Sequence, residues 1–157
     1  MPDLVLLDTM ICIWAFKGEA SPGQKEKIRE AREFIEYLDT EGYEVGISAV
    51  TLSELMVAVP DGRRQEFSRS LQDAVCVFAF DVGASIEAAR LFKKWLDERA
   101  EGSEGRQIVK ADCQIAGTAL SRKAAILYTE DAQLLKIVDR EIEARPMPAI
   151  PQQELDL

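Results

Sequence analysis

Residues 4–9, Leu4-Val5-Leu6-Leu7-Asp8-Thr9, combine an aliphatic run with an acid that ends it. A short run of this kind is typical of a strand that is buried on both faces of a parallel sheet. Asp8 would then stand at the carboxyl end of the strand, where open α/β sheets bind their ligands. An Asp or Thr in this place also caps a following helix. The stretch alone leaves open whether Asp8 is a cap or a functional acid, and Thr9 remains available as the cap.

Strand and helix patterns alternate along the rest of the chain. We expect further strands at residues 43–48, 75–80, 124–128 and 141–144. Helices are expected at residues 10–17, 21–38, 50–59, 64–71, 83–98, 108–122 and 131–138, the second of them opened by Ser21 and Pro22. This order predicts an α/β fold, a three-layer sandwich with a central, mainly parallel sheet of four to five strands flanked by helices.

At 157 residues the chain has the size of one domain, which we expect to span residues 1–145, followed by a tail at 146–157. Residues 100–106 (AEGSEGR) are rich in glycine and charge, and we expect them to be the most flexible segment. No apolar run is long enough to span a bilayer, and the N-terminus lacks the basic start of a signal peptide. We therefore expect a cytoplasmic protein that makes no membrane contact.

The chain contains no histidine, which narrows the chemistry available to it. Histidine is the usual general base, the usual zinc ligand and a member of most hydrolase triads. Cys12, Cys76 and Cys113 show no CxxC spacing and lie in apolar patterns, so we expect reduced, buried thiols. The formal net charge of −9 argues against a protein that coats nucleic acid. It is compatible with a nuclease or with a basic protein partner.

Three more acids are expected near the edge of the sheet where Asp8 lies. Glu54 falls one or two turns into the helix after the second strand, and Asp131 follows the fourth strand by two or three residues. If the strands are parallel, these carboxylates meet at one edge. Carboxylate oxygens are the ligands that hard divalent cations prefer, so the acids predict a metal site.

Asp112 provides the strongest single argument for that site. On the predicted helix 108–122 its neighbours at helical spacing are apolar, namely Ile108, Ile115, Ala116 and Ala119. An ionised carboxylate on a stripe that faces the core is costly unless it is paired or bound to a cation.

Each of these acids also has a structural alternative. Glu54 would complete a capping box with Thr51 in Thr51-Leu52-Ser53-Glu54. Asp131 would cap or begin its own helix, and Asp112 would pair with a distant lysine.

Four motifs of the chain resemble those of PIN-domain ribonucleases in order and spacing: LLDTMICIWAF, ISAVTLSEL, KADCQIAGTAL and LYTEDAQLL. The resemblance runs from Leu4 to about Leu135 and is greatest to the VapC-type toxin of VapBC toxin–antitoxin systems. It implies a PIN-like endoribonuclease with one or two Mg²⁺ or Mn²⁺ ions, a cognate antitoxin protein as partner, and a homodimer. A PIN-domain nuclease of RNA processing and a PIN-like binding module without catalysis are the alternatives.

The resemblance also assigns roles to single residues. It implies metal-site and catalytic roles for Asp8, Glu54, Asp112 and Asp131. Thr129 matches the hydroxyl position before the last acid, and Ser48 matches the small hydroxyl residue that ends the second strand. Glu130 stands beside Asp131, so either could complete the site, and the family's spacing favours Asp131. Residues 51–71 match a region that contributes to dimer and antitoxin contacts.

RNA would need positive charge around so acidic a site. Lys110, two residues from Asp112, is the preferred candidate for an RNA contact. Further candidates are Lys93, Lys94, Arg63, Arg64 and Arg106, for which ordinary solvated surface is the alternative. A site with two ions roughly 3.5–4 Å apart would activate a water and stabilise the leaving oxygen. Such hydrolysis leaves 5′-phosphate and 3′-hydroxyl ends.

Overall fold

The computed structural model describes residues 2–99 and 105–149. Within these ranges one sheet has the strand order β3-β2-β1-β4-β5, and every neighbouring pair is parallel. Its strands are β1 (Leu4–Leu7), β2 (Glu44–Ser48), β3 (Cys76–Phe78), β4 (Ile126–Tyr128) and β5 (Ala144–Arg145). The predicted parallel sheet is confirmed, and the strand with which we began lies at its centre.

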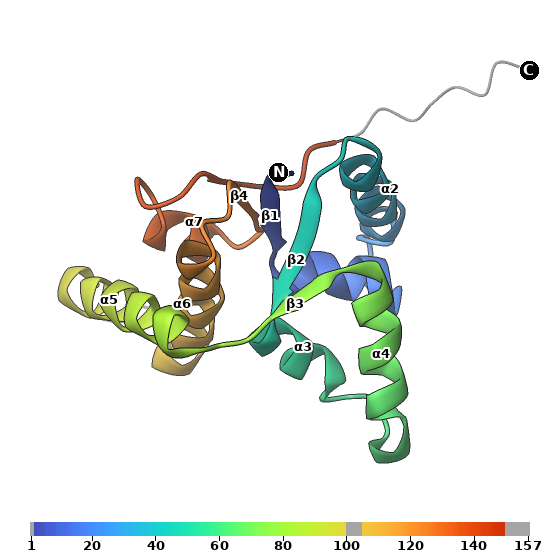
Figure 1. Ribbon diagram of the computed structural model, residues 1–157, viewed down its shortest axis with the longest axis horizontal. Coiled ribbons are helices and arrows are strands. Elements are labelled where there is room, and N and C mark those ends of the chain that lie inside the picture. Colours follow the sequence, from blue (N-terminus) through green and yellow to red (C-terminus); the bar gives the residue numbers. More distant parts are fainter. Residues whose placement is uncertain (1, 100–104, 150–157) are drawn as a thin grey trace, which may run out of the picture.

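Helices cover both faces of this sheet (Figure 1). Following β1 are α1 (Thr9–Cys12), the π-helical η1 (Ile13–Lys17) and α2 (Glu26–Thr40); following β2 are α3 (Ala49–Met56), the 3₁₀ turn η2 (Asp61–Arg63) and α4 (Arg64–Ala74). Following β3 are α5 (Val82–Glu98) and α6 (Arg106–Ser121), and α7 (Ala132–Ile137) follows β4. Helices α5, α6 and α7 lie on one face and α2 and α4 on the other, which confirms the three-layer sandwich.

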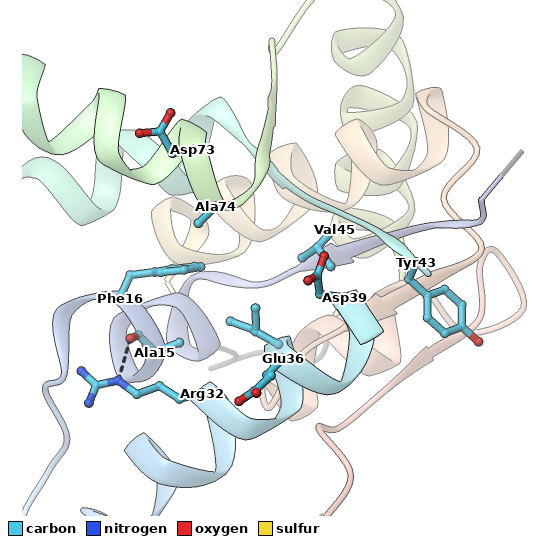
Figure 2. Close-up of a pocket in the computed structure, with 10 residues that line it drawn as sticks. Ala15, Phe16, Arg32, Glu36, Asp39, Tyr43, Val45, Asp73 and Ala74 are labelled. Carbon is cyan, nitrogen blue, oxygen red and sulfur yellow. Dashed lines mark hydrogen bonds between the residues drawn. The ribbon is translucent and has the colours of Figure 1, made fainter. Parts of the chain in front are cut away.

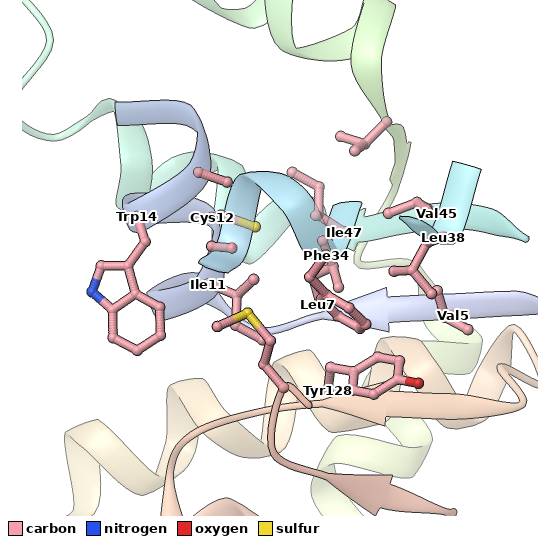
Figure 3. Packing of buried hydrophobic residues seen from close by; sticks show 14 of the residues in the cluster. Val5, Leu7, Ile11, Cys12, Trp14, Phe34, Leu38, Val45, Ile47 and Tyr128 are labelled. Atoms are coloured by element: carbon pink, nitrogen blue, oxygen red, sulfur yellow. The ribbon is translucent and has the colours of Figure 1, made fainter. Parts of the chain in front are cut away.

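The side chains of β1 alternate between the two layers because successive residues of a strand point to opposite faces. Leu6 packs with α5, α6 and α7, whereas Val5 and Leu7 pack with α1, α2 and α4. Figure 3 shows this second cluster, in which the edge of Phe34 meets the ring of Tyr128 at a centroid distance of 4.7 Å. The burial of β1 on both faces explains why it has no polar residue before Asp8.

The direction of strand order reverses between β1 and β4. From β1 the chain moves to β2 and β3 on one side, then returns to place β4 on the other side. The two strands stay paired to their ends, where the backbone N–H of Asp8 donates to the carbonyl oxygen of Tyr128 at 2.9 Å. Open α/β sheets form their binding crevices at the carboxyl ends of strands at such a point.

The start of α2 differs from the prediction. We expected Ser21 and Pro22 to open this helix, but it begins at Glu26. The preceding residues form a turn, in which the N–H of Gln24 donates to the carbonyl oxygen of Ser21 and Gly23 has a φ of 84°. A left-handed residue cannot be part of a right-handed helix, so Gly23 delays the helix start.

The cysteines are reduced as predicted, but one of them is not buried. Cys12 and Cys113 are buried, whereas Cys76 is exposed and donates its S–H to Glu44 Oε1 at 3.4 Å. Cys76 begins β3, which is one of the two edge strands of the sheet. The expectation of a buried thiol was wrong because an apolar sequence pattern does not distinguish an edge strand from a central one.

Close packing of α6 against α5 depends on Gly117. A Cβ at this position would lie 2.6 Å from the carbonyl oxygen of Ala84 and 2.7 Å from the backbone nitrogen of Ala88. Because these are backbone atoms, α5 would have to move to make room. We expect Gly117→Ala to lower the free energy of unfolding by about 1–3 kcal/mol in urea titrations. Gly62→Ala, where nothing lies within 4 Å of the added Cβ, is the control, and an equal loss there would contradict the packing argument.

Two expectations fall wholly or partly outside the described ranges: residues 100–104 of the expected flexible segment, and residues 150–157 of the expected tail. At the start of that tail, Met147 is buried, and its N–H donates to Glu130 Oε1 at 3.0 Å. None of the helices in residues 2–99 and 105–149 combines the length and the apolar character that crossing a bilayer requires.

Candidate active site

A pocket of about 350 Å³ lies where β1, β2 and β4 end. It brings together all four predicted acids, although they are far apart in sequence. Its lining consists of Asp8, Thr9, Met10, Ile13, Glu54, Asp112, Ile115, Glu130 and Asp131. Sequence reasoning did not assign Met10, Ile13 or Ile115 to the site, since these residues fit an ordinary core pattern.

Asp8 is held by hydrogen bonds to both of its carboxylate oxygens. It is the N-cap of α1, and its Oδ1 accepts from the N–H of Thr9 at 2.7 Å. The Thr129 hydroxyl donates to Oδ2 at 2.6 Å. Asp8 is therefore the cap of α1, and Thr9 is not. Because the same side chain also lines the pocket, the capping role of Asp8 does not exclude a functional one.

Burial dominates the electrostatics of Asp8. Desolvation raises the pKa of its carboxyl above the ordinary value of 3.8, and the nearby charges of Asp131 and Glu54 raise it further. The hydrogen bonds from Thr129 and Thr9 act in the opposite direction without cancelling the rise. The ionised carboxylate is thus destabilised in a way that a nearby cation would relieve.

This raised pKa predicts a pH-dependent stability. The folded state holds the Asp8 proton more tightly than the unfolded state, so the contribution of Asp8 to stability falls as pH rises above about 4, the ordinary pKa range of Asp. Asn cannot ionise, and we expect Asp8→Asn to gain stability relative to wild type as pH rises above about 4. Urea titrations in chelator at several pH values measure this difference; a difference that does not change with pH would contradict the raised pKa.

Glu54 enters the pocket from α3, and the alternative that it forms a capping box is wrong. The N-cap of α3 is Ser48, whose Oγ accepts from the N–H of Val50 at 3.2 Å. Thr51 lies inside the helix, so it does not form a capping box with Glu54. Instead Glu54 Oε1 accepts a hydrogen bond of 2.9 Å from the hydroxyl of Thr9, 45 residues earlier in the chain.

Asp131 combines a capping role with its place in the pocket. Its Oδ1 accepts from the N–H groups of Gln133 and Leu134 at 2.8 and 3.0 Å, which caps α7. Its own N–H donates to Thr129 Oγ1 at 3.1 Å, so Thr129 links Asp8 to Asp131. Glu130 also lines the pocket, and its Oε1 accepts from the N–H of Met147 at 3.0 Å.

Asp112 lies at the pocket wall on α6. Ile115, Ala116 and Ala119 are buried as predicted, whereas Ile108, one turn before Asp112, is 58% exposed. The predicted stripe is therefore buried only on the C-terminal side of Asp112, and on its N-terminal side the buried residue is Val109.

Ser48 and Thr118 form a pair of buried hydroxyls outside the pocket lining. Their oxygens are 3.0 Å apart, and Thr118 donates to the carbonyl oxygen of Gln114 at 2.9 Å. This pair joins the end of β2 to α6. Neither Ser48 nor Thr118 lines the pocket.

The six basic candidates for RNA contact do not line the pocket within the described ranges. Lys110 is exposed on α6. Residues two positions apart on a helix do not share a face, so it points away from Asp112. Lys94 pairs with Glu141, and Arg64 pairs with Asp61.

The chemistry of the pocket fits a hard divalent cation, since its charged groups are all carboxylates. As the carboxylates are placed, however, they do not form the coordination shell of a metal ion. Among the residues that the structure describes, no group of three or more His, Cys, Asp or Glu side chains is arranged so that it could hold a metal ion. The hydrogen bonds to Asp8, Glu54 and Asp131 hold these acids at the walls, and the acids would have to close in around an ion.

A different pocket of about 420 Å³ lies between η1, α2 and the end of α4 (Figure 2). Its acids are Glu36, Asp39 and Asp73, all of them exposed. Arg32 donates to the carbonyl oxygen of Ala15 at its rim. All three acids of this pocket are exposed and well solvated, whereas the pocket of the four acids includes the buried Asp8, so this larger pocket is a weaker candidate for a metal centre.

Comparison with known proteins supports the fold. The chain is similar to the Rickettsia felis VapBC2 structure bound to a promoter DNA fragment, with a TM-score of 0.66, 15% identity and coverage of 92% of this chain and 99% of the other. It is similar to DNA-bound VapBC from Salmonella typhimurium, with a TM-score of 0.64, 21% identity and coverage of 94% and 100%. A Klebsiella pneumoniae toxin–antitoxin complex has a TM-score of 0.60, 18% identity and coverage of 93% and 99%.

At these identities the similarities establish the fold alone. No curated protein shows significant sequence similarity to the chain. The sequence model of the PIN domain, however, matches residues 5–140, which include all four acids. The chain belongs to the PIN domain family.

Proposed function

We propose that the chain is a metal-dependent endoribonuclease that hydrolyses RNA phosphodiester bonds at the pocket of Asp8, Glu54, Asp112 and Asp131. The observation that carries this proposal is the convergence of these acids, from four separate stretches of sequence, at the carboxyl edge of a parallel sheet. A chance cluster of acids at the surface would not include Asp8, whose side chain is almost wholly buried.

Mg²⁺ or Mn²⁺, as one or two ions, would be held by these four carboxylates. A bound ion would neutralise the phosphate and lower the pKa of a water molecule. The chain supplies the remaining requirements. Thr129 and the N–H of Thr9 fix both oxygens of Asp8, while Ile13 and Ile115 give the pocket apolar walls that limit access of water.

The absence of histidine supports carboxylate-based proton transfer. Burial raises the pKa of the Asp8 carboxyl, and its side chain lines the pocket. We assign to Asp8 the uptake of a proton released there, together with the role of ligand.

We further propose that the chain is the toxin of a type II toxin–antitoxin pair, active as a homodimer in the cytoplasm. Two observations support this proposal. The similar solved structures are VapBC or toxin–antitoxin complexes, and a net charge of −9 suits a basic protein partner. Lys110, exposed on α6 two residues from Asp112 but outside the pocket lining, remains the proposed RNA contact. Expression of the chain alone should arrest growth, and expression of Asp112→Asn should not.

The nuclease proposal is tested by incubating the purified chain with end-labelled RNA in Mg²⁺, in Mn²⁺ and in chelator. We expect internal cleavage with either ion and none in chelator. Cleavage that is as fast in chelator as in Mn²⁺ would contradict the proposal.

A further inference from the structure

We propose that Thr9 is a positioning residue that fixes two acids of the site at once, Asp8 through its backbone and Glu54 through its hydroxyl. This inference rests on the proposed function, because it concerns the ability of these acids to bind a divalent ion. Sequence reasoning gave Thr9 only the role of a helix cap, which the structure assigns to Asp8.

The two contacts of Thr9 reach acids on different elements. Its N–H donates to Asp8 Oδ1 at 2.7 Å, and its Oγ1 lies 2.9 Å from Glu54 Oε1. Asp8 is at the end of β1 and Glu54 is on α3, so Thr9 joins two walls of the pocket. Thr129 does the same for Asp8 and Asp131. The acids are thus connected in the order Glu54, Asp8, Asp131 by two threonines.

The Thr9 hydroxyl has a second acceptor on α3, the hydroxyl of Thr51. Thr51 is buried, and Thr9 Oγ1 donates to Thr51 Oγ1 at 3.1 Å. A hydroxyl has one proton, so Thr9 shares it between Thr51 and Glu54. Hydrogen bonds to a carboxylate are stronger than those to a neutral hydroxyl, which favours the contact with Glu54.

The contact with Thr9 restricts the side chain of Glu54. It is an exposed residue with a long side chain, which in solvent would sample many rotamers. One hydrogen bond at Oε1 selects a rotamer and still leaves lone pairs of the carboxylate for an ion. Residues that orient metal ligands in this way typically contribute about 10–100-fold to metal affinity.

The test is a calorimetric Mn²⁺ titration of wild type, Thr9→Val and Thr9→Ser. Val has the shape of Thr without its hydroxyl, and we expect Thr9→Val to bind Mn²⁺ about 10–100-fold more weakly. Thr9→Ser restores the hydroxyl and should bind almost as tightly as wild type. All three keep the N–H that contacts Asp8. Thr9→Ala is the second variant without a hydroxyl and should behave like Thr9→Val. Affinity equal to that of wild type in Thr9→Val or in Thr9→Ala would overturn the inference.

Thr118→Val is the matched control. It too loses a hydroxyl that pairs with a second buried hydroxyl, that of Ser48, but it contacts none of the acids. We expect Thr118→Val to be less stable to urea in chelator and to keep the Mn²⁺ affinity of wild type. A loss of affinity equal to that of Thr9→Val would overturn the inference, because the effect would then not require contact with Glu54.

A double-mutant cycle isolates the contact itself. In a Glu54→Gln background, Thr9→Val should have little further effect on Mn²⁺ affinity, since the group that Thr9 positions has been changed. Additive losses would overturn the inference. If wild type binds no Mn²⁺, the proposed function fails as well. If wild type binds and Thr9→Val binds equally, the positioning role alone fails.

Discussion

Replacing Asp8 or Asp112 with Asn is expected to lower the rate of RNA cleavage in Mn²⁺ at least about 100-fold. Each change keeps the size of the side chain and removes one negative charge from the pocket. Asn is also a good N-cap, so Asp8→Asn should keep α1 in place. Initial rates on an end-labelled RNA, with folding checked by urea titration, measure the effect.

Asp73→Asn is the control for these two variants. Asp73 is an exposed acid of the larger pocket, far from the four acids in sequence and absent from the lining of their pocket. Its replacement makes the same chemical change and should leave the rate unaltered. Undiminished cleavage in folded Asp8→Asn and Asp112→Asn would remove the basis for the site.

Mn²⁺ is expected to raise the thermal midpoint of the wild-type chain by about 5–10 °C at 100 times its dissociation constant. A ligand that binds only the folded state contributes about 2.7 kcal/mol at that concentration. One kcal/mol shifts the midpoint of a chain of this size by about 2–4 °C. Asp112→Asn should respond hardly at all, because it lacks one of the ligands. Thermal scans with and without Mn²⁺ measure the shift.

The response of Asp73→Asn again serves as the reference and should match that of wild type. If Asp112→Asn shows the same shift as wild type, the ion binds elsewhere on this acidic surface. Such a result would separate metal binding from the pocket even if cleavage were lost.

The sequence was sufficient for the features that depend on local pattern. An aliphatic run that ends in Asp8 is the pattern of a central parallel strand, and β1 is central and buried on both faces. Asp131 was placed at the right edge because it closely follows a strand. Because parallel strands end at the same edge of a sheet, the sequence also predicted that Asp131 lies near Asp8.

Features that depend on contacts between distant residues were not predictable in this way. The hydrogen bond between Thr9 and Glu54 spans 45 residues, and neither residue type indicates the other. The alternative role of Glu54 in a capping box rested on Thr51-Leu52-Ser53-Glu54, which fits that local pattern, but the cap of α3 is Ser48. The strand was predicted to end at Ser48, and α3 begins directly after it, so the alternative placed the cap three residues too late.

The two expectations about exposure that proved wrong have a common cause. Ile108 was assigned to a buried stripe, and Cys76 to a buried strand, from apolar spacing alone. Each lies at a margin, Ile108 near the start of α6 and Cys76 on the edge strand β3. Spacing identifies the face of an element that can be buried, and the neighbours available in three dimensions decide how far the burial extends.

Analysis of the RNA ends produced in Mn²⁺ tests the proposed carboxylate-and-metal hydrolysis most directly. Attack of water on phosphorus, with departure of the 3′-oxygen, predicts 5′-phosphate and 3′-hydroxyl ends at every internal cut. Ends with 2′,3′-cyclic phosphate would mean that the RNA's own 2′-hydroxyl is the nucleophile. That result would contradict a site in which the four acids serve to hold ions that activate water.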